Sequence, residues 1–260
     1  MSFVEDVVLG LVQGLTEFLP VSSSGHLVVV PALAGWDDPS IGFDLLLHVG
    51  TLLAVLVYFR ADLARLARGL FGRSDDVAAD RRMVLYLGAA TVPAAVAGLG
   101  FEDFFEDLFD EPLWVCLFWV VTAVILVGGE RLHQAAAPRA MTFGTAMLIG
   151  SAQAVALAPG ISRSGATIAV GLALGLPRLE AARFAFLLAI PAIGGGALTL
   201  IPDVLDGTFD LTGSVLAGFV VAAASGYVAV SALLRLVRTR SLAPFALYLV
   251  VVAPLAALAL

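Results

Sequence analysis

The chain has 260 residues, of which 60% are hydrophobic, and its mean hydropathy is +1.01. Its long apolar windows exceed what the core of a soluble protein needs and match the hydrocarbon layer of a bilayer, so the composition excludes a soluble protein and indicates an integral membrane protein. The formal net charge is −7, with 14 basic against 21 acidic residues, which argues against nucleic acid as a partner.

In chain order, the apolar pattern predicts two interrupted segments and six membrane spans. The interrupted segments are residues 4–34 and 143–176, and the spans are residues 43–59, 83–101, 113–129, 184–201, 211–234 and 243–260. A polar turn divides each interrupted segment into two pieces that are shorter than the about 20 residues of a transmembrane helix. We therefore expect each to form a re-entrant helix–loop–helix hairpin that enters and leaves the membrane on one side.

The two interrupted segments contain the same motif at a constant offset. Gly10, Gln13, Ser22, Ser24, Gly25 and Gly35 fall on Gly150, Gln153, Ser162, Ser164, Gly165 and Gly175. Corresponding broken helices in the two halves of a membrane protein indicate a binding site near the bilayer midplane. The predicted fold is therefore one all-α integral membrane domain with two repeats, residues 1–142 and 143–260, each a hairpin followed by three transmembrane helices.

The arginines are confined to alternate loops. Loops with arginine lie at residues 60–82, 131–139, 178–183 and 235–240, whereas those at residues 37–38, 102–111 and 203–210 contain no basic residue. Because cytoplasmic loops accumulate Arg and Lys, we predict a multi-pass protein with both termini outside and with the second repeat inverted relative to the first. Two short full crossings in place of each hairpin would give the same orientation, so the charge pattern does not distinguish these arrangements.

The polar groups of the two turns suit an anion. Gln13 and Glu17 are four residues apart, so on a helix they lie on one face. Pro20 ends that helix, and a second half-helix is expected to start near Ser24, with hydroxyl caps and free backbone N–H groups facing the turn. Helix amino termini attract phosphate, and the Arg163 guanidinium can bind phosphate oxygens through two hydrogen bonds. The turns are thus predicted to form an anion clamp near the middle of the membrane.

Glu17 and Arg163 need a reason to lie in a membrane, since insertion scales assign about 2.5–3.5 kcal/mol to an Asp, Arg or Lys at the bilayer centre. One explanation is the anion clamp, and the other is that the two side chains only pair with each other and hold the hairpins together. The surrounding hydroxyl groups favour the clamp. His26, close to Ser23, is a candidate general base or nucleophile, whereas His48 is expected to serve in packing or hydrogen bonding.

Two stretches of the chain resemble a known family. Residues 13–26, Gln-Gly-Leu-Thr-Glu-Phe-Leu-Pro-Val-Ser-Ser-Ser-Gly-His, are similar to the first signature of the undecaprenyl-diphosphate phosphatases of the bacitracin-resistance type, and residues 159–167, Pro-Gly-Ile-Ser-Arg-Ser-Gly-Ala-Thr, to the second. The resemblance covers nearly the whole chain. It implies a plasma-membrane enzyme that hydrolyses a polyprenyl diphosphate to the monophosphate lipid carrier and phosphate, with an inverted repeat, two re-entrant hairpins and an active site that opens outward.

Matching positions carry the implied roles. Glu17 matches the essential acid, Ser23 and His26 match the nucleophile or base, with water as a third candidate nucleophile, and Arg163 matches the phosphate-binding arginine. The further phosphate-binding residues are Ser22, Ser24, Gly25, Ser162, Ser164, Gly165 and Thr167. We further expect a divalent cation, Mg²⁺ or Ca²⁺, on Glu17, with Gln13 as a second candidate ligand.

Three positions depart from the family pattern. Gln13 stands where the family also has an acid, which removes one possible metal ligand, while Ala185 replaces a serine and Leu249 an arginine. The alternative function is a polyprenyl-phosphate translocase or a secondary transporter, because inverted repeats with interrupted helices are also transporter architecture. The predicted partners are the polyprenyl diphosphate and membrane lipids, and a homodimer stays open beside a monomer.

Overall fold

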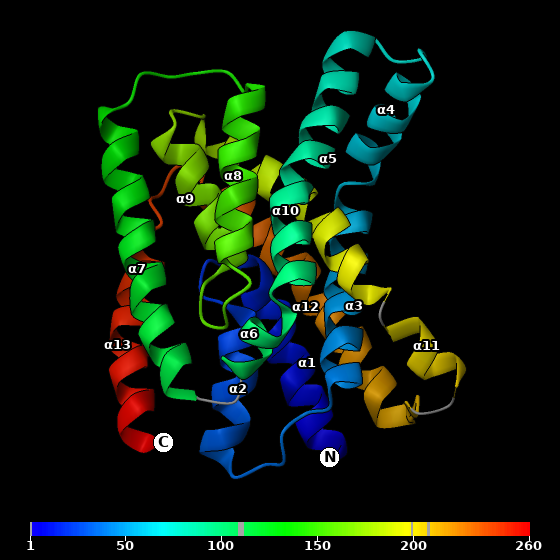
Figure 1. Cartoon of the computed structure of the whole chain (residues 1–260), viewed down its shortest axis with the longest axis vertical. Helices are drawn as coiled ribbons and strands as arrows, with labels where there is room; N and C mark the ends of the chain where they lie inside the picture. Colours follow the sequence, from blue (N-terminus) through cyan, green and yellow to red (C-terminus); the bar gives the residue numbers. More distant parts are fainter. Residues whose placement is uncertain (1, 109–111, 199, 207–208) are drawn as a thin grey trace.

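A computed structural model describes residues 2–108, 112–198, 200–206 and 209–260 (Figure 1). These residues form α-helices joined by turns, and no strand occurs among them, which confirms the all-α prediction. The helices of the first half are α1 (Phe3–Phe18), α2 (Ser23–Ala34), α3 (Ile41–Tyr58), α4 (Arg60–Leu70), α5 (Val77–Gly100), α6 (Glu102–Asp107) and α7 (Pro112–Ala135). Those of the second half are α8 (Phe143–Val155), α9 (Arg163–Ala173), α10 (Arg178–Ala197), α11 (Leu200–Leu205), α12 (Gly213–Leu236) and α13 (Ala243–Ala259).

Within the described residues, five helices are long and apolar enough to cross a membrane, namely α3, α5, α7, α10 and α12. They correspond to five of the six predicted spans. The sixth predicted span forms α13, which is apolar and has 17 residues. The predicted loops at residues 102–111 and 203–210 include residues 109–111 and 207–208, which lie outside the described part of the chain.

Several helices differ from the sequence-based expectation, and two of them, α6 and part of α11, lie in loops expected at residues 102–111 and 203–210. The basic stretch after residue 59, which was expected to be a loop, contains the amphipathic helix α4. The span expected at residues 184–201 corresponds to α10, which begins earlier, at Arg178, and also ends earlier, at Ala197. Arg178 and Arg183 can enter the helix since each is paired with a carboxylate: Arg178 lies 2.6 Å from Glu130, and Arg183 lies 2.5 Å from Asp62.

Both interrupted segments form helix–turn–helix units at the predicted places. Pro20 disfavours helical geometry at the residue before it, and α1 accordingly ends at Phe18. In Figure 1, α1 runs from the end that carries both termini to about half the height of the molecule, and α2 returns to that end. α8 and α9 do the same from the opposite end, where the α4–α5 and α7–α8 connections lie. The two turns therefore lie near mid-height.

Each unit packs along a helix of the other half through small residues. α1 packs mainly against α12, and α8 packs mainly against α5. A Cβ atom at Gly10 would lie 2.3 Å from the main-chain oxygen of Gly218, and one at Gly150 would lie 2.2 Å from that of Ala90. Both contacts are too close for any side chain, so glycine is required for these helices to approach each other.

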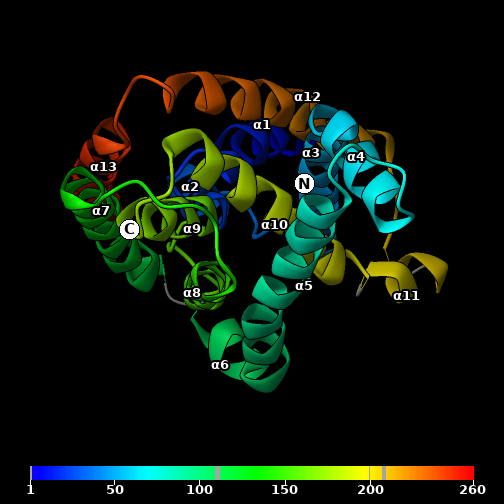
Figure 2. The same cartoon turned by 90° about the horizontal axis from the view of Figure 1, so that it is seen from above.

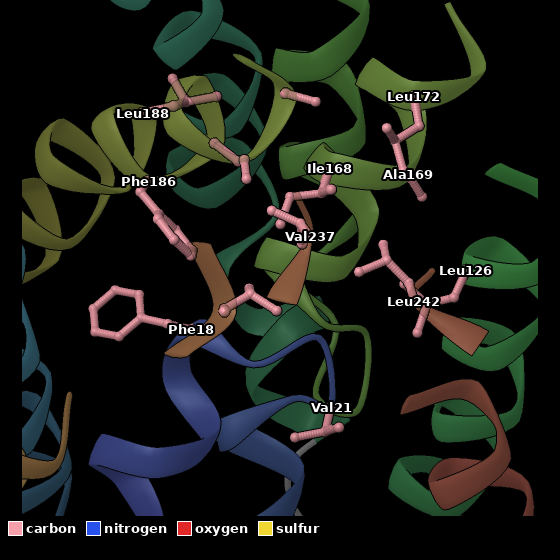
Figure 3. Close-up of a cluster of buried hydrophobic side chains, with 14 of the residues drawn as sticks. Phe18, Val21, Leu126, Ile168, Ala169, Leu172, Phe186, Leu188, Val237 and Leu242 are labelled. Atoms are coloured by element: carbon pink, nitrogen blue, oxygen red, sulfur yellow. The ribbon is translucent and has the colours of Figure 1, made fainter. Parts of the chain in front are cut away.

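The main apolar core lies around the second unit and beside the turn of the first. Seen from above, α9 and α10 lie towards the middle of the molecule, with α12 and α5 farther out (Figure 2). Figure 3 shows Phe18 and Val21, which flank and line the first turn, beneath Ile168 of α9 and Phe186 of α10. The rings of Phe18 and Phe186 meet edge to face at 5.5 Å between centroids. This packing places the first turn against helices of the second half.

Candidate functional site

The two turns begin their second helices in the same way. Ser22 is the N-cap of α2, and its hydroxyl accepts a hydrogen bond from the Gly25 N–H at 3.4 Å. Ser162 is the N-cap of α9, and its hydroxyl accepts one from the Gly165 N–H at 3.1 Å. In each turn the capping hydroxyl also lies 3.2 Å from that of the serine two residues later, Ser24 or Ser164. Both caps satisfy one of the free N–H groups at a helix start.

Ser22 has an unusual backbone. Its φ is +66°, and it is the only non-glycine residue with positive φ in the described part of the chain. Such a conformation costs of the order of 1–3 kcal/mol and persists only where its surroundings enforce it, commonly at functional sites. The main-chain oxygen of Ser22 lies 2.7 Å from His26 Nδ1, so His26 helps to hold this backbone in place.

Glu17 is the point at which the two turns meet. The Arg163 guanidinium donates to Glu17 Oε1, and the Ser23 hydroxyl donates to Oε2. Gln13, one turn earlier on α1, donates its side-chain Nε2 to the same Oε2 at 3.1 Å. The Glu17 side chain is only 4% exposed, and a buried carboxylate is tolerable because donors surround it. A carboxylate, a hydroxyl and a guanidinium are thus brought together from both halves of the chain.

A second set of hydrogen bonds ties the turns to each other and to α7. Ser164 Oγ donates to the main-chain oxygen of Leu19 at 3.1 Å, which joins the start of α9 to the first turn. On α7, Thr122 Oγ1 donates to the Gly160 oxygen at 2.9 Å and accepts from the Ser162 N–H at 3.1 Å. Thr167, by contrast, donates to the Arg163 main-chain oxygen at 2.7 Å, within its own helix.

His48 on α3 lies nearer to this cluster than the sequence analysis anticipated. Its Nε2 is 3.7 Å from Glu17 Oε2, and its side chain is 28% exposed. Its Nδ1 lies 2.8 Å from the main-chain oxygen of Asp44. A histidine within an apolar span, away from both ends of the helix, was the available signal, because such residues in membrane helices mark functional sites.

His26, in contrast, is engaged away from Glu17. Beside the Nδ1 contact to Ser22, its Nε2 lies 2.8 Å from the Tyr248 hydroxyl on α13. Its ring lies 4.8 Å from that of Trp119 and stacks on Tyr248 at 5.9 Å between centroids. Both ring nitrogens therefore have partners other than Glu17 and Arg163, and the described contacts of His26 support the turn rather than the carboxylate.

Most of the candidate residues therefore lie in one small region. Glu17, Ser23 and Arg163 are in direct contact, with Gln13 beside them. The remaining phosphate-binding candidates form the two helix starts, namely Ser22, Ser24, Gly25, Ser162, Ser164 and Gly165. The amide oxygen of Gln13, Oε1, is buried and has no hydrogen-bond partner in the described structure. An acceptor left without a donor is unusual in a buried position.

Two comparisons with known proteins indicate the same family. The family model described as "Bacitracin resistance protein BacA" matches residues 6–255. Three similar proteins are each named undecaprenyl-diphosphatase. One from Trichlorobacter lovleyi is 43% identical, covering 95% of this chain and 93% of that protein, and one from Syntrophotalea carbinolica is 44% identical, covering 95% of each. One from Rubrobacter xylanophilus is 43% identical, covering 99% of this chain and 98% of that protein.

Proposed function

The chain belongs to the bacitracin resistance protein BacA family, and from this membership we propose that it is an undecaprenyl-diphosphatase, an enzyme that hydrolyses a polyprenyl diphosphate to the monophosphate and phosphate. The similar proteins carry that name over nearly their whole lengths. Within this chain, the observation that carries the proposal is the contact of Glu17 with both Ser23 and Arg163. It brings a carboxylate, a hydroxyl and a guanidinium to one point between the hairpin turns.

The starts of α2 and α9 are the proposed cradle for the diphosphate. Their free N–H groups and partial positive charge favour an anion, and the hydroxyl groups of both caps add hydrogen-bond donors. Arg163 is the first residue of α9, so its guanidinium and the helix start act on the same phosphate. In the free protein this guanidinium is held by Glu17. Because the Arg163 side chain is 20% exposed while Glu17 is 4% exposed, Arg163 is the one of the two that can reach an incoming phosphate.

Ser23 is the group best placed to attack phosphorus. Its hydroxyl already donates to Glu17 Oε2, so the carboxylate can take the proton as the serine oxygen bonds to the terminal phosphorus. The bond from that phosphorus to the bridging oxygen breaks, and the bridging oxygen leaves on the polyprenyl monophosphate. A water molecule then cleaves the phosphoserine and yields phosphate. His26 acts in this scheme by holding the Ser22 backbone, which precedes the nucleophile.

The residues at the turns fit the implied divalent cation. Glu17 would supply carboxylate oxygens, and Gln13 would supply its amide oxygen after turning its amide nitrogen away from Glu17. Hard cations such as Mg²⁺ and Ca²⁺ take oxygen ligands of these kinds. When bound, the cation would neutralise charge on the diphosphate, which is the main requirement of phosphoryl transfer.

The two interrupted segments are proposed to be re-entrant hairpins of an inverted repeat, with residues 1–142 and 143–260 as its halves in one membrane domain. Helix packing supports this assignment. The first helix of each hairpin packs against the corresponding helix of the other half: α1 against α12, and α8 against α5. Each contact is made through the corresponding glycine, Gly10 or Gly150. Gly35 and Gly175, which follow the two hairpins, both have positive φ.

The protein is a multi-pass membrane protein, and the arginine-rich connections are proposed to face the cytoplasm. Figure 1 places the α4–α5 and α7–α8 connections at the end opposite to both termini, which is the arrangement expected from the positive-inside rule. Under this orientation the termini lie outside, and we propose that the site opens to the same face. This places it where a lipid diphosphate released by envelope assembly would be exposed.

Phosphate release from undecaprenyl diphosphate by the purified protein in detergent tests this function. Wild type and Arg68→Ala, which changes an exposed arginine whose side chain donates to the Ala64 main-chain oxygen of the same helix, should release phosphate at similar rates, whereas Arg163→Ala should not. A wild-type protein that moves polyprenyl phosphate across liposomes but releases no phosphate would instead support the translocase alternative. The mass of the purified particle would show whether the protein is a monomer or a homodimer.

A further inference from the structure

A hollow with a volume of about 280 Å³ lies on the surface of α12, towards the end of the helix that leads to α13. It is lined by Tyr227, Val228, Ser231, Ala232 and Arg235. These residues recur at intervals of three and four, so they share one face of the helix. The side chains of Ser231 and Ala232 are small, whereas those before and after them on this face are large, and this difference in size accounts for the hollow.

The hollow lies on a face of α12 that the other helices leave uncovered. The helix is long and apolar enough to cross a membrane, and it lies at the edge of the molecule in Figure 2. Tyr227 and Val228 are 40% and 60% exposed. The Tyr227 ring lies 5.5 Å from that of Tyr58 on α3, between centroids, so it is held beside the hollow. On a membrane-spanning helix such a face meets lipid, and a ligand of the hollow must come from the bilayer.

Arg235 lies at the depth where lipid headgroups are expected. At about 1.5 Å per residue, it is about 33 Å along α12 from Gly213, the first residue of the helix. The hydrocarbon layer is about 30 Å thick. Tyr227 lies about 12 Å deeper along the same helix. A ligand that fits this arrangement has a charged group at the membrane surface and an apolar chain below it.

The charges around the hollow select the sign of that group. Arg235 forms no ion pair with a carboxylate among the described residues. The sequence from Gly213 to the end contains no acidic residue, and its only charged side chains are Arg235, Arg238 and Arg240. A guanidinium binds phosphate oxygens through two hydrogen bonds. A zwitterionic headgroup would also bring its own cation towards these arginines, so the charge favours an anionic phospholipid.

We propose that the hollow is a binding site for an anionic phospholipid, whose phosphate binds Arg235 and one of whose acyl chains lies over Ser231 and Ala232. The chain would make the van der Waals contacts that the small side chains leave unmade. The site uses no residue of the hairpin turns, so it goes beyond the proposed function and does not depend on it.

Native mass spectrometry of the purified full-length protein tests the site, with phosphatidylglycerol and phosphatidylcholine as the probes. The wild type should retain one phosphatidylglycerol molecule more tightly than any phosphatidylcholine. Arg235→Gln should weaken this binding about fivefold, as expected for the loss of one basic side chain beside an anionic surface. Arg238→Gln is the matched control and should keep the binding, since Arg238 is exposed near the same end of α12 but does not line the hollow.

A second pair of variants tests the hollow without changing the charge. Ala232→Leu fills it and should also weaken phosphatidylglycerol binding, whereas Ala224→Leu, at an exposed position of α12 outside the hollow, should not. Because both positions are exposed, both variants should melt at the wild-type temperature. Equal retention of the two lipids by the wild type, or unchanged binding in Arg235→Gln and Ala232→Leu, would overturn the proposal. A homodimer that dissociates in Ala232→Leu would assign this face to a second copy of the chain and would also overturn it.

Discussion

Arg163, the first residue of α9, donates to the carboxylate of Glu17 near the end of α1, so one ion pair joins the two halves of the chain at their turns. Both partners are mostly buried, and each belongs to a turn that also carries capping serines. A pair of this kind could hold the turns together, bind the substrate, or do both. Mutations that separate stability from turnover can decide among these roles.

The double variant Glu17→Gln with Arg163→Met separates these roles. Either single substitution leaves a buried charge without its partner, which costs about 3–5 kcal/mol, whereas the double variant removes both charges. We expect thermal unfolding in detergent to show that the double variant regains most of the stability lost in each single one. Phosphate release should stay at background in all three. Recovery of turnover in the double variant would mean that the pair serves only as a structural link.

Ser23→Ala should reduce phosphate release by at least about a thousandfold, as loss of a covalent nucleophile does, while Ser24→Ala should reduce it far less. The two serines are adjacent, but only Ser23 donates to Glu17, whereas Ser24 contacts the Ser22 hydroxyl. Mass spectrometry of protein quenched during turnover should find phosphate on Ser23. A phosphohistidine at position 26, or full activity of Ser23→Ala, would contradict the proposed attack.

His26→Asn should retain part of the activity, because asparagine can still donate to the Ser22 main-chain oxygen that His26 contacts. His26→Ala should lose more, since the positive-φ backbone at Ser22 is then less well held. Tyr248→Phe removes only the hydroxyl next to Nε2 and should be close to wild type. Equal and complete loss in both His26 variants, measured as kcat for phosphate release, would point to a direct chemical role.

Gly10→Ala should destabilise the protein by about 1–3 kcal/mol, the usual cost of overpacking. The added Cβ would lie 2.3 Å from the Gly218 main-chain oxygen. Gly88→Ala is the control: it also lies within a long helix, but its Cβ would meet nothing within 4 Å, so better helix propensity should leave stability unchanged or raised by up to about 1 kcal/mol. Melting temperatures in detergent compare the two, and an unaffected Gly10→Ala would argue against the close helix contact.

Cysteine labelling tests the orientation. The chain has one cysteine, Cys116, which is buried, so Cys116→Ala gives a background free of thiols. On that background, Asp38→Cys should react in intact cells with a reagent that cannot cross the membrane, and Arg139→Cys should react only after the cells are opened. The opposite labelling pattern would place the arginine-rich loops outside and would turn the site towards the cytoplasm.

The turns were the most predictable part of the molecule. Pro20 and the capping serines act through local backbone geometry, so the end of α1 and the starts of α2 and α9 follow from nearby residues alone. The meeting of Glu17 with Arg163 was also predictable, because two costly charges in apolar segments must be compensated within the membrane.

Features that depend on distant partners were not predictable in the same way. The ion pairs of Arg178 with Glu130 on α7 and of Arg183 with Asp62 on α4 join residues far apart in the sequence, and no local pattern reveals them. The approach of His48 to Glu17 depends on how α3 packs against α1. His26 looked like a partner of Ser23 in the sequence, but its ring turns towards Tyr248 of α13, which lies at the other end of the chain.

The packing of α1 on α12 has a consequence for biosynthesis. The first hairpin is made before α12, the helix that covers Gly10. Arg163, at the start of α9, is made between the two, so the Glu17 carboxylate lacks this partner until α9 has been made. Assembly of the proposed site is therefore a late event, and we expect a nascent chain truncated before α12 to contain every residue of both turns and still be inactive.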